Sequence, residues 1–170
     1  MNRSFDFQPT LTGDLVQLRP LLELDYDQLR RVAGDPLIWE QHPVPDRWRA
    51  PRFDDYFRQR IARGGTLVVT DRSASEVIGA TEFHDFRPEM GQIEIGASFL
   101  ARRYWGGAYN GEMKRLMTGH AFRFVDSVVF AVSERNLRSQ RALLKIGAIA
   151  EQSLIRNGLP YLLFRMKRDR

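Results

Sequence analysis

Three strand-like runs follow one another in the middle of the chain, with only short turns between them. The runs are Thr66–Thr70, Val77–Phe86 and Gln92–Leu100. The connections are rich in Asp, Ser, Pro and Gly, which favour turns. Because so short a connection cannot carry the chain back to the starting end of a strand, neighbouring runs must be antiparallel. The sequence therefore predicts an antiparallel meander, around which the remaining elements have to pack.

Alternation and helical spacing predict further elements on both sides of the meander. We expect single strands at Leu15–Arg19 and Ser127–Val132, and a closing hairpin of Ala148–Ile155 and Tyr161–Met166 around the turn signal Asn157-Gly158. We expect helices from Asp25 or Asp27 to Gly34, through Phe53–Ile61, from Ala108 along the stripe to Phe124, and from Asn136 to Ile146, with a short helix and an ordered loop at Pro36–Trp48. This order predicts an α+β (mixed α/β) fold in a single domain, residues 1–170.

Composition indicates a soluble globular protein. Hydrophobic residues make up 43% of the chain and charged residues 28%, and the longest apolar stretch, Val128–Val132, is far too short to span a membrane. The N-terminus, Met1–Asp6, lacks the apolar run of a signal peptide. The chain contains no cysteine, which excludes disulfides, thiolate catalysis and thiolate metal sites. A cytoplasmic protein that contacts no membrane is therefore expected.

The net charge of +5 is unevenly distributed along the chain. Residues 1–85 carry 11 basic and 14 acidic side chains, whereas residues 86–170 carry 15 basic and 7 acidic ones. A basic C-terminal half suggests an anionic partner, either nucleic acid or a small polyphosphorylated cofactor. It can also be a solvated basic face followed by a basic tail, Arg165–Arg170. Charge by itself does not decide between these interpretations.

A loop rich in arginine and glycine joins the last strand of the meander to the next helix. Arg102 and Arg103 come first, and Gly106-Gly107 precedes the helix that begins near Ala108. A helix N-terminus presents unpaired N–H groups, glycines let the backbone approach a ligand closely, and guanidinium groups suit phosphate oxygens. A plain strand-to-helix turn with incidental surface arginines explains the same residues about equally well.

Three segments in order resemble the motifs of the GNAT acetyltransferases, over about Leu15 to Met166. Arg103-Tyr104-Trp105-Gly106-Gly107-Ala108 is similar to the Arg/Gln-x-x-Gly-x-Gly/Ala pyrophosphate motif of that family. The segment Asn136–Ala148 is similar to its Asn-x-x-Ser-x-x-x-x-x-Lys-x-Gly-Phe/Ala pattern. Glu94-Ile95-Gly96 followed by Phe99-Leu100 resembles the preceding strand in the ribosomal-protein N-terminal acetyltransferase branch.

The resemblance implies a seven-stranded mixed sheet that splays between its fourth and fifth strands, flanked by about four helices. Acetyl-CoA would lie in the split as cosubstrate, and no metal would be needed. Backbone N–H groups around Ser98–Ala101 would polarise the thioester carbonyl. The residues implied to contact the cofactor are Phe99, Leu100, Arg102, Arg103, Trp105, Gly106, Gly107, Ala108, Asn136, Ser139 and Lys145.

Acetyl transfer to an amine needs a base for the amine and an acid for the departing thiolate. Glu94 is the first candidate for the base and His84 the second. Solvent can also remove the proton before the amine binds. Members of the family that this chain resembles often use a nearby tyrosine as the proton donor. The helix that contains Ser139 has no tyrosine, so Ser139 is the candidate donor here. Asn136 can contact the pantetheine arm, or it can simply be the N-cap of that helix.

The acceptor would be a primary amine, either a peptide N-terminus or a small molecule. The resemblance places its cleft at the first two helices, where Trp39 would form an apolar wall and Glu40 would anchor a cationic amine. Glu82 shares a strand face with His84 and is a further candidate contact. Trp39 as ordinary core and Glu40 as a solvated side chain remain the alternative. A homodimer is compatible with the family, and a non-catalytic CoA-binding or nucleic-acid-binding module is the competing functional interpretation.

Overall fold

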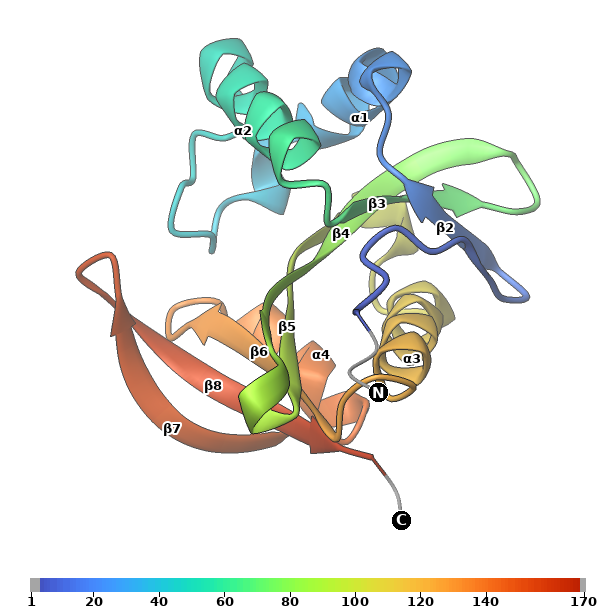
Figure 1. Ribbon diagram of the computed structural model, residues 1–170. Coiled ribbons are helices and arrows are strands. Elements are labelled where there is room, and N and C mark those ends of the chain that lie inside the picture. The colour runs from blue at the N-terminus through green and yellow to red at the C-terminus, as the bar shows by residue number, and fades with distance from the viewer. Residues whose placement is uncertain (1–3, 169–170) are drawn as a thin grey trace.

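A twisted sheet of eight strands runs through the structure, which is a computed structural model and is described here for residues 4–168 (Figure 1). The sheet order is β1-β2-β3-β4-β5-β6-β8-β7. The strands are β1 Leu11–Thr12, β2 Val16–Pro20, β3 Thr66–Asp71, β4 Glu76–Arg87, β5 Gln92–Leu100, β6 Ser127–Ser133, β7 Ile149–Arg156 and β8 Leu159–Lys167. Part of the N-terminal segment, residues 1–3, and the end of the basic tail at Arg170 lie outside the described residues.

The predicted fold class is confirmed, and the predicted strand count is wrong by one. The structure adds β1, which pairs antiparallel with β2 through Leu11 and Thr12. Two residues are too few to show alternation, so the sequence pattern gave no signal for this strand. The meander is confirmed, because β3, β4 and β5 pair antiparallel in chain order.

Two pairs of helices cover opposite faces of the sheet (Figure 1). They are α1 Tyr26–Ala33, α2 Ala50–Arg63, α3 Ala108–Ala121 and α4 Leu137–Lys145, with short 3-10 turns at Glu23–Asp25, Pro36–Ile38, Pro88–Met90 and Arg102–Tyr104. Phe53 and Phe57 of α2 pack in one apolar core, and Met113 and Met117 of α3 pack in the other. Among the described residues, no helix is long and apolar enough to cross a membrane.

Turn residues end the elements where the sequence signals predict. Helix α2 stops at Gly64, whose φ of 70° lies in the left-handed region that favours glycine. Asn157 and Gly158 join β7 to β8 with φ values of 51° and 74°. Positive φ at two successive positions is typical of the tight hairpin turns whose twist matches that of the strands. The hairpin signal is therefore confirmed.

The sheet splits between β5 and β6, as the resemblance implies. These two strands are parallel and pair only at Gln92–Ser127, Ile93–Val128 and Glu94–Val129. Beyond those pairs β5 continues to Leu100 and β6 to Ser133 without meeting. With β1 counted, the split falls between the fifth and sixth strands of the sheet, which are the fourth and fifth of the predicted set.

A bulge at Ala97 changes which face the side chains of β5 reach. Ala97 has φ of 48°, in the left-handed region that residues with a Cβ rarely adopt. The register between β4 and β5 shifts opposite this position. Ile95 packs in the core beneath α3, and without a bulge Phe99 would join it there. Phe99 instead packs in the core beneath α1 and α2, so the bulge inverts the alternation before the strand reaches the split.

Candidate active site

A cleft of about 640 Å³ opens where β5 and β6 separate. Three segments form it: the last residues of β5, the loop and first turns of α3, and the exposed face of α4. The loop after α1 closes its remaining side. Its lining residues are Ile38, Trp39, Gln41, His42, Ser98, Phe99, Leu100, Trp105, Gly106, Gly107, Asn110, Gly111, Asn136, Leu137, Arg138, Ser139, Arg141, Ala142, Lys145 and Ile146.

The N-terminus of α3 forms an open cradle in this cleft. Gly107 is the N-cap residue, and no side chain within residues 4–168 caps the helix. Gly106 has φ of 72°, and a Cβ added at Gly106 or Gly107 would meet no atom within 4 Å. Unpaired N–H groups at the start of a helix attract anions, and the space in front of these glycines admits a phosphate. The residues present therefore fit the pyrophosphate of a CoA molecule.

The two arginines predicted to hold that pyrophosphate point elsewhere. Arg102 is ion-paired with Asp35, and Arg103 is ion-paired with Glu76. Neither arginine lines the cleft, nor does Ala108, which opens α3 behind the two glycines. Trp105 does line the cleft, and its indole N–H donates to the carbonyl of Leu100 at 2.9 Å.

Positive charge reaches the cleft from α4 instead. Arg138, Arg141 and Lys145 line it, and of these only Lys145 was predicted. Helical geometry offers the signal that sequence reasoning missed, because residues 138, 141 and 145 follow i, i+3, i+7 spacing and share one helix face. A basic face on α4 opposite the α3 cradle suits a polyphosphate.

Asn136 and Ser139 meet at the start of α4. The side-chain oxygen of Asn136 accepts from the backbone N–H of Ser139 at 3.1 Å, so the N-cap interpretation of Asn136 is correct. Both residues also line the cleft. Asn136 can therefore fix the helix and still present its amide N–H₂ to a ligand.

Arg138 links α4 to the loop that follows α1. Its guanidinium lies over the Trp105 ring at 3.9 Å, donates to the carbonyl of Ile38 at 2.9 Å and pairs with Glu40 at 3.2 Å. Glu40 was predicted to anchor a cationic amine, but in this structure its carboxylate is bound to Arg138 outside the cleft lining. Arg138 was not predicted as a site residue.

Trp39 separates the cleft from the core under α1 and α2. It is 3% exposed, its indole N–H donates to the carbonyl of Ala33 at 2.7 Å, and its ring packs 4.9 Å from that of Phe99. His42 meets its edge, and burial lowers the pKa of His42 to about 3. The wall next to Phe99 therefore consists of two neutral rings, with the guanidinium of Arg47 5.3 Å from the centre of the Trp39 ring. Trp39 is both core and cleft lining.

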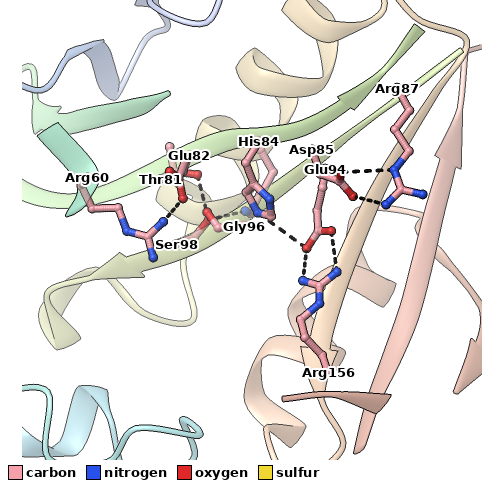
Figure 2. Close-up of polar contacts among 11 residues, drawn as sticks. Arg60, Thr81, Glu82, His84, Asp85, Arg87, Glu94, Gly96, Ser98 and Arg156 are labelled. Carbon is pink, nitrogen blue, oxygen red and sulfur yellow. Dashed lines mark hydrogen bonds and ion pairs between the residues drawn. The ribbon is translucent and has the colours of Figure 1, made fainter. Parts of the chain in front are cut away.

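The three titratable candidates, Glu82, His84 and Glu94, lie along β4 and β5 on the side of the sheet that α1 and α2 cover (Figure 2). Glu94 is 2% exposed, and both of its oxygens accept from Arg156, at 2.7 and 2.8 Å. Glu82 is ion-paired with Arg60, and its second oxygen is buried with no partner among the described residues. Neither carboxylate lines the cleft.

His84 lies between the two ion pairs, over Gly96 (Figure 2). A Cβ at Gly96 would come within 2.6 Å of its Nε2 atom, so only glycine leaves room for this ring position. Burial lowers the pKa of His84 and outweighs the opposing effect of Glu94, whose Oε1 is 3.6 Å from Nε2. His84 is therefore neutral near pH 7, with a lone pair to accept a proton.

The family model for the GNAT acetyltransferase domain matches residues 16–149. The chain therefore belongs to the GNAT acetyltransferases, and the resemblance drawn from its motifs is confirmed. A search of the curated proteins finds no match. Acetyl transfer is the activity of the family, and the particular acceptor is taken up below.

Solved structures share this fold at low sequence identity. A GNAT-family protein from Chromobacterium violaceum has a TM-score of 0.84 at 21% identity, covering 97% of this chain and 90% of its own. RimJ of Mycobacterium smegmatis, solved in complex with CoA-disulfide, has a TM-score of 0.73 at 19% identity, and the match covers 94% of this chain and 87% of RimJ. Spermidine N-acetyltransferase of Vibrio cholerae, solved with CoA and spermine, has a TM-score of 0.70 at 14% identity, and the match covers 91% of this chain and 96% of that enzyme.

Proposed function

We propose that the chain transfers the acetyl group of acetyl-CoA directly to a primary amine, with both bound at once. The observation that carries this proposal is the split itself. Beyond Glu94 and Val129 the edge of β5 that faces β6 has no strand partner in the described part of the chain, while Ser98, Phe99 and Leu100 line the cleft. Unpaired backbone N–H groups there are fixed dipoles that stabilise negative charge on a carbonyl oxygen.

The donor is proposed to lie across α3 and α4, where acetyl-CoA supplies an acetyl group activated as a thioester. The cradle at Gly106 and Gly107 would take the pyrophosphate, with Arg141 and Lys145 beside it on α4. Asn136 would hold the pantetheine arm. Both partners must be aligned for direct transfer, and a preformed cleft of this kind supplies that alignment.

We assign the base to His84, which lines a second cavity together with Glu82 and not the cleft itself. It is neutral, it is 27% exposed, and Gly96 holds its ring over β5 just before the bulge. Glu94, the first candidate from the sequence, has both oxygens engaged by Arg156 and is more suited to positioning His84. Glu82 and Trp39 remain proposed contacts of the acceptor amine, and Ser139 remains a proposed proton donor to the thiolate.

The class of reaction is tested by following free CoA release over a panel of peptide N-termini, polyamines and amino acids. We expect turnover on at least one amine. We also expect acetyl-CoA to raise the melting temperature more than a DNA duplex does at about 150 mM salt. Stabilisation by DNA but not by acetyl-CoA would favour a nucleic-acid-binding module. Binding of acetyl-CoA without turnover on any amine would indicate a non-catalytic CoA-binding protein.

The residue roles are tested on the best acceptor from that panel. Loss of a general base typically costs about 100- to 10,000-fold in rate. We expect His84→Gln to fall in that range, and Glu94→Gln to have a smaller effect with a displaced pH profile. Asp85→Asn is a matched control on the same strand, because its carboxylate is exposed, pairs with Arg87 and does not line the cleft. Full turnover by His84→Gln would contradict the assignment of the base.

A further inference from the structure

Lys114 of α3 is a buried amine without an acidic partner. The residue is 6% exposed. Among the described residues no carboxylate lies within ion-pair distance of Nζ, which lies 5.4 Å from the centre of the Phe130 ring. Burial of an unpaired ammonium destabilises the folded protein, and groups of this kind cluster at functional sites.

The hydrogen bond of this amine leads to the cleft. Nζ donates to the hydroxyl oxygen of Ser98 at 2.6 Å, and Ser98 lines the cleft next to the bulge in β5. The Ser98 oxygen also lies 3.2 Å from the carbonyl of Gly96 and 2.8 Å from the hydroxyl of Thr81 (Figure 2). Because Lys114 donates to the serine oxygen, the serine proton points to an acceptor, which in this structure is the carbonyl of Gly96. To reach a departing sulfur, the hydroxyl has to rotate away from that carbonyl.

Lys114 and His84 lie on opposite faces of β4 and β5. Thr81 contacts Met117 of α3 at 3.0 Å, so it faces the helix that carries Lys114. His84 lies an odd number of positions further along β4 and so faces the other way, toward Glu94. An amine arriving from the side of α1 and α2 therefore meets His84, while a thiol leaving along α3 and α4 passes Ser98.

We propose that Ser98, in place of Ser139, protonates the departing sulfur and that Lys114 resupplies its proton. This inference rests on the proposed function. Attack by the neutral amine forms the new C–N bond as the C–S bond breaks, and the sulfur takes the Ser98 hydroxyl proton. One proton passes from Lys114 to the serine oxygen, and another leaves the amine nitrogen to His84. Before the next turnover His84 releases its proton to water and Lys114 takes one up from water.

The environment of Lys114 suits a proton donor at neutral pH. Burial lowers its pKa from 10.5 to about 7 and is the cause of the shift. The groups that its amine contacts are Ser98 from β5 and Phe130 from β6, and Thr81 from β4 bonds Ser98 in turn; none of these titrates in this range. The base His84 has a pKa below its usual 6.5. An unprotonated base and a protonated acid therefore coexist between the two values.

Two variants that remove a proton donor, and one that keeps the hydroxyl, test the roles of Ser98 and Lys114. We expect Ser98→Ala and Lys114→Met each to lower kcat about 100-fold, the lower end for general acid catalysis, with little change in KM for acetyl-CoA. Wild-type kcat should fall as pH rises through about 7, and Lys114→Met should lose that limb. Ser98→Thr keeps the hydroxyl and should retain most activity. Met113→Leu alters the buried side of α3 outside this hydrogen-bond chain and is the matched control.

A second readout separates this inference from the proposed function. Slow hydrolysis of acetyl-CoA in the absence of any amine also releases the thiol and needs the same acid. If no amine is acetylated but hydrolysis still depends on Ser98 and Lys114, the result contradicts the proposed function and supports proton donation to the sulfur by these two residues. Wild-type rates and pH profiles in both Ser98→Ala and Lys114→Met would overturn the inference. A loss of activity in Ser139→Ala alone would transfer the role to Ser139.

Discussion

At the scale of single residues, the pairing of Glu94 with Arg156 links the end of β7 to β5 of the meander. Arg156 is the last residue of β7 and reaches across to β5, with both of its terminal nitrogens on the Glu94 carboxylate. Glu94 is buried, while the Arg156 side chain is 38% exposed. Glu94 therefore depends on a partner that water can also reach.

We expect Arg156→Gln to destabilise the protein by about 3 kcal/mol, because it leaves a buried carboxylate without its charged partner. That figure is the lower end for a broken buried pair, since water reaches Arg156. Glu94→Gln combined with Arg156→Gln removes both charges and should recover most of the loss. Urea unfolding of the two single variants and the double variant measures this coupling, and additive losses would contradict it.

The residue scale also shows where sequence reasoning reached its limit. Lys114 was not singled out, although residues 114, 117 and 121 share the buried stripe of α3, and a lysine at that spacing is a visible signal. The bulge at Ala97 had no signal, because alanine carries no preference for positive φ. The ion pairs of Arg102 and Arg103 join residues far apart in the chain, which local patterns cannot reveal.

At the scale of elements, the buried amine of Lys114 in α3 lowers the stability of the folded protein. The folded pKa of Lys114 is about 7, against 10.5 for an exposed lysine. Between these values the unfolded chain binds more protons than the folded one, so this group's contribution to stability increases as pH rises. The penalty of the buried lysine is largest at or below pH 7 and is nearly gone above its unfolded pKa.

We therefore expect Lys114→Met to be more stable than the wild type at neutral pH. The free-energy difference should shrink by about 3 kcal/mol between pH 7 and pH 10, from the linkage of the shifted pKa. Chemical unfolding of both proteins at the two pH values measures it. All other titrating groups are common to the two proteins and cancel. A difference independent of pH would mean that Lys114 does not titrate in this range.

Helix α4 begins with a cap that also lines the cleft, and the two roles can be separated. Asn136→Ala should cost about 1 kcal/mol, because the N–H of Ser139 loses its acceptor. Asn136→Asp keeps an acceptor at the cap and should preserve the melting temperature. If the amide N–H₂ contacts the cofactor, both variants should weaken acetyl-CoA binding in calorimetry. Normal binding by Asn136→Asp would leave Asn136 with the capping role only.

At the scale of the whole molecule, the order of elements and the split were accessible from the sequence. Periodicity located the meander, both halves of the closing hairpin and four helices, because each is a local pattern. The split came from the motif resemblance, since nothing in the spacing alone ends the pairing of β5 with β6 at Glu94. Which arginines face the cleft depended on packing and needed the structure.

The open edge of β5 makes a prediction for hydrogen exchange. Amide groups of β5 that face the split beyond Glu94 have no partner strand among the residues that the structure describes. They should exchange faster than those facing β4 in the absence of ligand, and they should become protected when acetyl-CoA is added. Mass spectrometry of peptides covering residues 95–100 follows both states. Protection confined to α4, with none in β5, would place the cosubstrate outside the split.

The short contact between β5 and β6 also bears on the order in which the molecule assembles. All pairings from β1 to β5 involve residues that leave the ribosome before residue 127, whereas β6 meets β5 through only three residue pairs. The first five strands, with α1 and α2, can therefore associate while the rest of the chain is still being synthesised. We expect the cleft to be the last feature to form, completed only when the C-terminal hairpin arrives.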